Sequence, residues 1–284
     1  MKIMICGADG KLGQRLARDL GPRNDVRAFC YADLDIERLD PVYQTAREIK
    51  PDAIINAAAF TAVDRCEDEI DAAYRANAVG VRNLAVAADS VGARLVHFST
   101  DFVFDGERSG PPYREYDTPN PLSVYGKSKL TGEREALQNC GRGMVLRLAW
   151  VYGPGGWNFT DWVVDQARQG KEMRVVTDQI GTPTWTGDVV RQVARLLDED
   201  GRGLYHATGG GECSRYEWAC EALRLAGLPT ERVIPVTSEA LVQKAPRPRY
   251  SVLDNFFLRG QDLDVMRDWR EALSEHLNEA GALT

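Results

Sequence analysis

Short continuous apolar runs alternate with helical patterns in the first half of the chain. The runs cover residues 2–6, 26–29, 52–58, 94–100 and 144–150. Segments such as 11–20 and 67–91 lie between them and carry apolar residues at helical spacing. Strands covered by helices on both faces read as continuous apolar runs, and this alternation is typical of a parallel sheet. Right-handed crossovers then predict a doubly wound α/β fold.

The second half is less regular but remains structured. The segment 187–197 places its apolar residues on one helix face, which predicts a core helix. Residues 202–208 read as a strand, and a helix over 215–227 ends at Gly227 with Pro229 beyond it. We expect a first domain over residues 1–150 and a smaller α/β domain over 151–284. Elements near 186–208 are expected to return to the first domain.

Composition excludes several classes of function. The chain has 284 residues, 44% of them hydrophobic, which allows a full core. A net charge of −7 with scattered Lys and Arg argues against binding nucleic acid. The most apolar stretch, residues 53–63, is far shorter than the roughly 20 residues that span a bilayer. The first residues run straight into a strand and contain no cleavage signal, so we expect a cytoplasmic protein.

Cysteine and histidine usage gives no sign of a metal centre. The six cysteines form no C-x-x-C pair, and thiols in such apolar settings behave as small hydrophobes in a reducing compartment. The three histidines are far apart in the sequence. We therefore predict no metal site.

A glycine turn follows the first strand and opens a helix. Gly7, Gly10 and Gly13 in ICGADGKLGQRL have the spacing G-x-x-G-x-x-G. In this context glycines let the backbone approach a pyrophosphate at the helix N-terminus, although tight strand-helix turns also use glycine for purely steric reasons. The position at the start of the chain favours dinucleotide binding over residues 1–150.

The ends of the next two strands leave the choice of cofactor open. An acid that binds the ribose 2′-hydroxyl of NAD usually ends the second strand, but Cys30 and Tyr31 stand there. Asp33 or Asp35 is a candidate for contact with the adenosine and Lys11 for contact with a phosphate, and all three fit a solvated surface equally well. Small residues end the third strand at 56–58, which makes room for a ligand at the carboxyl edge of the sheet.

Tyr125 and Lys129 form the most informative pair. Four residues apart on a predicted helix, they share a face, and a nearby ammonium lowers the pKa of a phenol from its reference value of about 10. When hydride adds to a carbonyl carbon, the oxygen needs a proton and a second hydrogen-bond donor. Thr100, at the end of the strand in HFSTDFVF, supplies that donor. Alone the pair proves little, but its order after the glycine turn predicts a hydride-transfer site.

The predicted cofactor-binding residues come from these strand ends and from the helix. They are Gly7, Gly10, Lys11, Leu12, Gly13, Asp35, Ile36, Asn56, Ala57, Ala58, Tyr125 and Lys129. The predicted cofactor is NADPH or NADH.

Five segments resemble the dTDP-4-dehydrorhamnose reductase family, a group of extended short-chain dehydrogenases/reductases with a Rossmann fold. They are GADGKLG, INAAAFTAVDRCE, STDFVFDG, PLSVYGKSK and RLAWVYGPGGWNF. The resemblance runs over nearly the full chain and is weakest after about residue 210. It implies that Thr100, Tyr125 and Lys129 form the catalytic set.

The same resemblance implies a set of substrate-binding residues. They are Val63, Asp64, Thr100, Asp101, Phe102, Tyr125, Trp150, Asn158, the segment 179–184 and Arg247. Trp150 would pack on the sugar, with an ordinary core aromatic as the alternative. Arg247 would bind the nucleotide diphosphate, with a solvated loop cation as the alternative. Arg147, inside an apolar strand, has no explanation at this level.

The resemblance implies reduction of the C4 ketone of dTDP-4-dehydro-6-deoxy-L-mannose to dTDP-L-rhamnose, without contact to membranes or nucleic acid. Alternatives are another nucleotide-linked 4-keto deoxysugar, or a non-catalytic role like that of the regulatory subunit of methionine adenosyltransferase. Some members dimerise through Mg²⁺ held by acidic residues, one of them in the first helix just after the glycine turn. Gln14 and Arg15 occupy that neighbourhood here, which argues against this metal and its dimer, and we expect a monomer or a homodimer.

Overall fold

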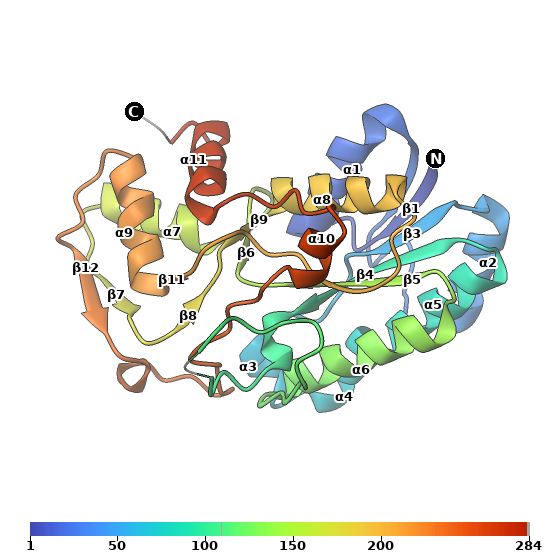
Figure 1. Cartoon of the computed structure of the whole chain (residues 1–284), viewed down its shortest axis with the longest axis horizontal. Coiled ribbons are helices and arrows are strands. Elements are labelled where there is room, and N and C mark those ends of the chain that lie inside the picture. Colours follow the sequence, from blue (N-terminus) through green and yellow to red (C-terminus); the bar gives the residue numbers. More distant parts are fainter. Residues whose placement is uncertain (109, 283–284) are drawn as a thin grey trace.

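The core of the molecule is a six-stranded, fully parallel sheet in the order β10-β5-β4-β3-β1-β2 (Figure 1). The computed structural model describes residues 1–108 and 110–282. The strands of this sheet are β1 (Lys2–Cys6), β2 (Asp25–Phe29), β3 (Ala53–Asn56), β4 (Arg94–Thr100), β5 (Gly143–Leu148) and β10 (Gly203–His206). The doubly wound sheet predicted from the alternating pattern is confirmed.

Helices cover both faces of the sheet (Figure 1). One face carries α1 (Lys11–Leu20) and α8 (Thr186–Asp198), and the other carries α2 (Leu39–Ile49), α5 (Gly80–Ser90) and α6 (Val124–Asn139). Successive residues of a strand point to opposite faces. In β1, Ile3 and Ile5 therefore pack under α1 and α8, whereas Met4 and Cys6 pack under α2 and α5. Both faces are buried, which is why the strands read as continuous apolar runs.

The stretch expected to be one long helix over 67–91 is divided. It consists of α4 (Ile70–Tyr74), a π-helical turn, η2 (Arg75–Val79), and α5, with the short α3 (Val63–Cys66) before them. The wider turn places Asn77 inside, where its amide donates to Ser128 Oγ at 3.0 Å and accepts from the Phe60 backbone N–H at 2.9 Å. The turn thus ties the loop after β3 to α6, which carries Tyr125 and Lys129. Such turns concentrate near functional sites.

A smaller lobe with its own hydrophobic core lies at the carboxyl edge of the sheet (Figure 1). Its helices are α7 (Phe159–Arg168), α9 (Arg215–Leu225) and α11 (Trp269–Glu279). Its paired strands are β6 (Val151–Tyr152) with β9 (Thr184–Trp185), β7 (Met173–Val176) with β12 (Val233–Val236), and β8 (Ile180–Gly181) with β11 (Cys213–Ser214). The chain also forms η1 (Gly21–Arg23), η3 (Asp101–Val103), η4 (Ser238–Ala240) and α10 (Phe256–Gly260). We call the two parts the sheet lobe and the small lobe.

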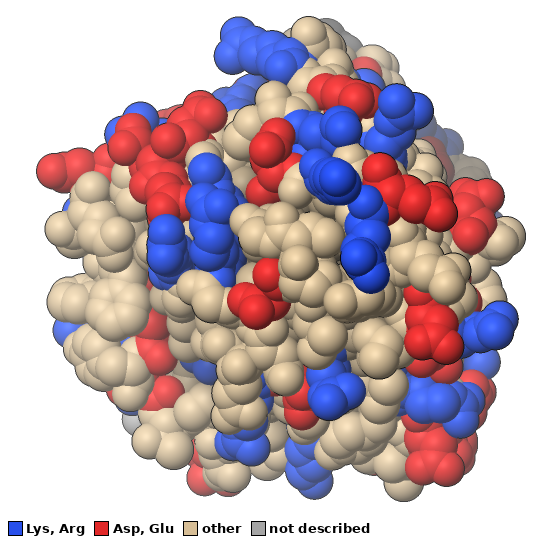
Figure 2. All heavy atoms as spheres, turned by 90° about the vertical axis from the view of Figure 1, so that its right-hand side faces the viewer, with Lys and Arg blue, Asp and Glu red and all other residues tan. Residues whose placement is uncertain are grey.

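The surface at the far end of the sheet lobe mixes charges of both signs. Figure 2 shows Lys and Arg interspersed with Asp and Glu over this face, with no large area of one sign. Several of these charges are paired across the surface, for example Arg94 and Arg142 with Asp200. In the described part of the chain, we find no helix of the length and apolar character needed to cross a membrane.

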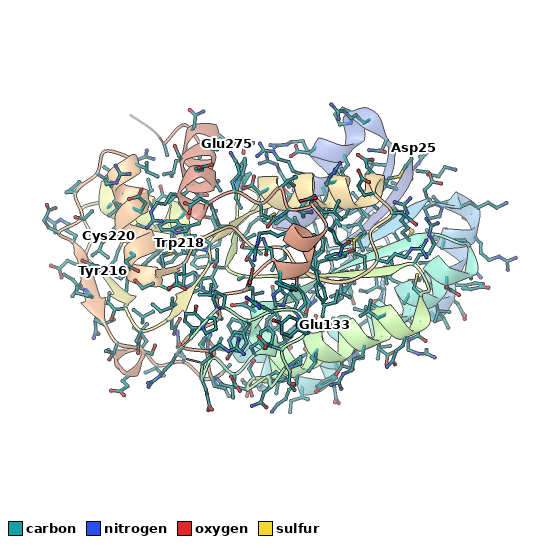
Figure 3. The ribbon with its side chains drawn as sticks, in the orientation of Figure 1. Asp25, Glu133, Tyr216, Trp218, Cys220 and Glu275 are labelled. Carbon is teal, nitrogen blue, oxygen red and sulfur yellow. The ribbon has the colours of Figure 1, made fainter. Side chains whose placement is uncertain are left out.

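A buried ion pair explains the arginine inside β5. Arg147 is only 2% exposed, and its guanidinium donates to both carboxylate oxygens of Glu133 on α6, at 2.8 and 2.7 Å. Ser99 Oγ donates to the same carboxylate at 2.5 Å. Figure 3 places Glu133 on the α6 side of the sheet. A guanidinium matched by two carboxylate oxygens is satisfied without water, so an apolar strand accommodates it.

Replacing one partner of this pair should destabilise the fold. In Glu133→Gln the charge of Arg147 stays buried without a counterion, so we expect the free energy of unfolding in urea to fall by about 3–5 kcal/mol. The exposed pair Arg65–Glu69 serves as the control, and Glu69→Gln should cost about 0–1 kcal/mol. Equal small losses in both variants would contradict a role for the buried pair.

Candidate active site

A cleft of about 880 Å³ lies between the two lobes at the carboxyl edge of the sheet. Most of the residues predicted from the sequence line it. They are Gly10, Lys11, Leu12, Asn56, Ala57, Ala58, Val63, Thr100, Asp101, Phe102, Tyr125, Lys129, Trp150, Asn158, Gln179 and Arg247. The fold therefore brings together side chains and backbone from distant parts of the sequence.

The glycine turn lies where the sheet order reverses, between β1 and β3. Gly7 has a φ of +79°, and its N–H donates to the Phe29 carbonyl at 2.9 Å. A Cβ on Gly7 would lie 2.4 Å from the Ala58 nitrogen, and one on Gly13 would lie 2.0 Å from the Gly7 oxygen. Gly7 and Gly13 thus allow close backbone packing, whereas Gly10 faces the cleft. Helix α1 begins at Lys11 without a side-chain cap, which leaves its first N–H groups without a side-chain acceptor, as at helix ends that bind anions.

Four predicted cofactor residues do not line this cleft: Gly7 and Gly13, which pack against backbone, and Asp35 and Ile36. Asp35 Oδ1 accepts a hydrogen bond from the Glu37 N–H at 3.0 Å, and the Ile36 side chain is buried in the core against α5. Asp33 similarly accepts from the Cys30 N–H at 3.0 Å within its own turn. Contact between Asp35 or Ile36 and a cofactor remains a prediction.

Helix α6 holds Tyr125 and Lys129 at the cleft. Ser123 Oγ caps the helix by accepting from the Gly126 N–H at 3.1 Å. Gly126 has no room for a side chain, because a Cβ there would lie 2.2 Å from the Phe102 carbonyl oxygen. This close packing fixes the first turn of α6 against the end of β4, where Thr100 lies.

The ammonium of Lys129 points toward the sheet. Lys129 Nζ donates to the Phe98 carbonyl at 2.6 Å and lies 3.4 Å from His97 Nε2. Burial lowers the pKa of Lys129 to about 8, although the nearby Glu133 carboxylate raises it. Burial and the charge of Lys129 hold the pKa of His97 well below its usual value, so His97 is neutral.

Burial is the main influence on the phenol of Tyr125. Burial raises the pKa of Tyr125, a hydrogen bond with Thr100 lowers it, and the charge of Asp101 raises it further. The Lys129 ammonium donates to the Phe98 carbonyl, and its acidifying effect on Tyr125 remains a prediction. Phe102 packs edge-on against the Tyr125 ring, with centroids 5.6 Å apart.

Thr100 and Asp101 complete this end of the cleft. Thr100 Oγ1 donates to Asp101 Oδ1 at 3.0 Å and accepts from the Phe102 N–H at 3.2 Å. Asp101 is 2% exposed, and its second oxygen, Oδ2, has no partner among the described residues. Burial raises the pKa of this carboxyl to about 6. A buried acceptor without a partner is costly, so Asp101 is suited to receive a hydrogen bond from a ligand.

Trp150 has a strained backbone at the boundary of the lobes. Its φ is +47°, an unusual value for a bulky residue, and such strain concentrates at functional sites. The ring is half-buried and lines the cleft, with Gly181 packed against it. The ring also packs against the small-lobe core and stacks with Trp218, with centroids 5.8 Å apart, so contact between Trp150 and the sugar remains a prediction.

Arg215 also lines the cleft and was missed by the sequence analysis. Its guanidinium lies 3.6 Å from the centroid of the Trp150 ring. Nothing in the local sequence separates it from a solvated arginine in the first turn of a helix. Only the packing of α9 against Trp150 reveals its position.

Two predicted substrate residues have structural partners. Asn158 caps α7 by accepting from the Asp161 N–H at 3.0 Å, and its amide donates to the Gly153 carbonyl at 3.0 Å. Arg247 donates to both oxygens of Asp64 at 2.5 and 2.9 Å, and this bonding lowers the pKa of Asp64 to about 2. Arg247 is thus held in an ion pair rather than solvated.

The neighbourhood of the glycine turn is also occupied by an ion pair. Arg15 donates to Asp19 at 2.5 Å and to Glu279 at 2.6 Å. Across residues 1–108 and 110–282, no group of three or more His, Cys, Asp or Glu side chains is arranged to hold a metal ion. Lys11 Nζ donates to the Trp157 carbonyl at 2.8 Å, which joins the glycine turn to the small lobe.

The parallel sheet, the glycine turn at its point of reversal and the Thr-Tyr-Lys group define a nicotinamide-dependent oxidoreductase of the short-chain dehydrogenase/reductase class. Residues 1–281 match the family described as RmlD substrate binding domain, and the chain belongs to that family. The resemblance inferred from the five segments is thereby confirmed.

Similar proteins cover nearly the whole chain. A solved dTDP-4-dehydrorhamnose reductase from Clostridium acetobutylicum is 43% identical, with a TM-score of 0.95, covering 99% of this chain and 100% of its own. The Bacillus anthracis dTDP-4-dehydrorhamnose reductase, solved in complex with NADP, is 37% identical, with a TM-score of 0.95 and 98% and 99% covered. A probable dTDP-4,6-dihydroxy-2-methyloxan-3-one 4-ketoreductase from Streptomyces antibioticus is 39% identical over 97% of this chain and 94% of its own.

Gly10 and Gly13, at the start of α1, should differ sharply in how well they tolerate replacement by alanine. Gly13→Ala places a methyl group against the Gly7 carbonyl, so we expect a loss of about 1–3 kcal/mol in the free energy of unfolding and weaker NADPH binding. In Gly10→Ala the nearest contact is an ordinary 3.4 Å, so its stability should change by less than about 1 kcal/mol. Urea unfolding and NADPH titration measure both effects. Similar stability of the two variants would argue against the close packing described for Gly13.

Proposed function

We propose that this protein reduces the C4 ketone of dTDP-4-dehydro-6-deoxy-L-mannose to dTDP-L-rhamnose, using NADPH or NADH. The observation that carries the proposal is the convergence of Thr100, Tyr125 and Lys129 at one end of a cleft lined by both lobes. The names of two similar solved proteins, both dTDP-4-dehydrorhamnose reductases, support the choice of substrate.

The residues on the sheet side fit a dinucleotide. The uncapped N-terminus of α1 suits a pyrophosphate, and the small residues Ala57 and Ala58 leave space beside it. Lys11 and Leu12 face the same part of the cleft, and Tyr125 and Lys129 lie at its inner end. Bound there, the dihydronicotinamide would supply the hydride.

Residues of the protein then stabilise the negative charge that develops on the carbonyl oxygen of the substrate. Reduction adds a hydride to the carbonyl carbon and a proton to its oxygen. Tyr125 donates this proton, and the Thr100 hydroxyl, which donates to Asp101 in this structure, would turn to donate its hydrogen bond to the same oxygen. Lys129 supplies positive charge at the inner end, where an ammonium stabilises developing negative charge on the substrate oxygen and on the phenolate. Asp101 Oδ2 accepts from a substrate hydroxyl.

The small lobe supplies the remaining contacts to the nucleotide sugar. Trp150 and Gln179 line the cleft at the small lobe, and Phe102 in η3 and Val63 in α3 line it from the sheet lobe. Trp150 presents an aromatic surface suited to the apolar face of a 6-deoxysugar. Six free cysteines are compatible with a cytoplasmic enzyme, acting as a monomer or a homodimer.

A second candidate is reduction of another dTDP-linked keto sugar. The similarity to the Streptomyces antibioticus ketoreductase favours it, since that relative is 39% identical. The same Thr-Tyr-Lys group would serve, and the choice between the two depends on the shape of the small-lobe side of the cleft. The presence of Thr100, Tyr125 and Lys129 together in the cleft disfavours a purely regulatory role.

The direct test combines the purified protein with dTDP-4-dehydro-6-deoxy-L-mannose and either NADPH or NADH. We expect loss of reduced-nicotinamide absorbance and formation of dTDP-L-rhamnose. Tyr125→Phe should lower kcat by roughly 10²- to 10⁴-fold with little change in NADPH affinity, because the proton donor is lost. Tyr116→Phe, at an exposed tyrosine outside the cleft, is the matched control and should retain full activity. Normal turnover by Tyr125→Phe would refute the assignment.

The pH dependence should report Lys129. Because burial lowers its pKa to about 8, the ammonium is present below that pH and is lost above it. We expect kcat/KM to fall above about pH 8. Lys129→Arg keeps its charge across this range, so its lower activity should show no such decline. An unchanged alkaline decline in Lys129→Arg would assign the titration to another group.

A further inference from the structure

Arg215 is presented to the cleft by the start of α9. Ser214 Oγ accepts from the Glu217 N–H at 3.0 Å, and the Glu217 carboxylate accepts from the Ser214 N–H at 2.7 Å. This capping box fixes the first turn, so Arg215 and Trp218, three residues on, share a face. Figure 3 shows Trp218 on the inner side of α9, with Tyr216 and Cys220 on its outer side.

Three aromatic rings surround the guanidinium. Its central carbon lies 3.6 Å from the Trp150 centroid, 5.3 Å from that of Trp218 and 5.6 Å from that of Phe159. Stacking on an indole engages the flat face of the guanidinium and leaves its N–H edge free for hydrogen bonds in the plane. The group is therefore rigidly placed while its donors remain available.

The charge of Arg215 has no counterion. In the part of the chain that the structure describes, no carboxylate lies within 4.0 Å of its nitrogens, and none of its N–H groups has a protein acceptor. Burial lowers the pKa of Arg215 to about 10, Asp101 raises it at longer range, and the like charge of Arg247 lowers it. A guanidinium stays protonated at neutral pH, and an anion is the partner that best offsets the cost of its partial burial.

The other two cleft arginines differ in this respect. Arg247 is satisfied by both oxygens of Asp64 and by the Ala245 carbonyl. Arg174 lines the cleft from β7 but is exposed to solvent. Of the three, Arg215 alone combines partial burial, rigid stacking and the absence of a described ion-pair partner.

We propose that Arg215, rather than Arg247, is the principal cation that binds the diphosphate of the nucleotide sugar, an assignment that rests on the proposed function. The planar fork matches two phosphate oxygens, which a neutral sugar ring does not provide. The pyrophosphate of the dinucleotide is served separately by the N-terminus of α1, in the sheet lobe. Arg215 thus determines specificity for a phosphorylated sugar over a free one.

The test uses dTDP, which carries the diphosphate but no sugar. Calorimetric titration should show that Arg215→Gln weakens dTDP binding by roughly 10- to 100-fold, since hydrogen bonds to charged groups are the strong ones. Arg215→Lys should recover only part of the loss, because an ammonium lacks the planar fork. NADPH affinity and thermal stability, measured on the same samples, should stay unchanged.

Two further variants sharpen the result. Arg224→Gln, on the exposed side of α9, is the matched control and should bind dTDP as the unchanged protein does. Arg247→Gln should weaken dTDP binding less than Arg215→Gln. Unchanged dTDP affinity in Arg215→Gln would overturn the proposal. If only the KM for the dTDP-keto sugar rose, Arg215 would contact the sugar, and the proposal would again be wrong.

The experiment separates this inference from the proposed function. Arg215-dependent binding of dTDP without ketone reduction would support the diphosphate site and refute the reductase assignment. If the protein reduced the ketone but Arg215→Gln kept full dTDP affinity, the reductase assignment would be supported and the diphosphate site refuted.

Discussion

The whole active region depends on three backbone segments that meet with no space for side chains. At the reversal of the sheet order, Gly7 contacts Ala58 after β3, and Gly13 in α1 contacts Gly7. This packing sets where α1 begins and how closely it approaches β1 and β3. The uncapped helix end and the small residues after β3 consequently face the same cleft. Side-chain bulk at Gly7 or Gly13 would separate the segments and move both walls of the site.

Local patterns predicted the sheet and the reacting group because both follow from short-range rules. Continuous apolar runs identify doubly covered strands, and the carboxyl ends of parallel strands meet at one edge. Thr100 ends β4, and Tyr125 and Lys129 share one face of α6, so the three were expected to converge. The glycine spacing identified the turn for the same reason, since its steric requirement is local. These features need no knowledge of how distant segments pack.

The partners of several site residues depend on contacts between segments that are far apart in the sequence. The sequence did not reveal that Asp64, 183 residues earlier, forms an ion pair with Arg247. Arg215 reads as a surface residue until Trp150 is placed beneath it. The sequence likewise did not reveal that the Phe98 carbonyl accepts a hydrogen bond from the Lys129 ammonium. In each case the competing partner is a group that spacing and periodicity do not reveal.

The pair between Asp64 and Arg247 also joins the two lobes. Asp64 belongs to α3 in the sheet lobe, and Arg247 lies on the segment that returns from β12 of the small lobe. The Lys244 and Ala245 backbone N–H groups donate to the same carboxylate, so one acid anchors four donors of the crossing segment. These hydrogen bonds fasten residues 244–247 to α3. Because Arg247 lines the cleft, this part of its wall is held to the sheet lobe by a single carboxylate.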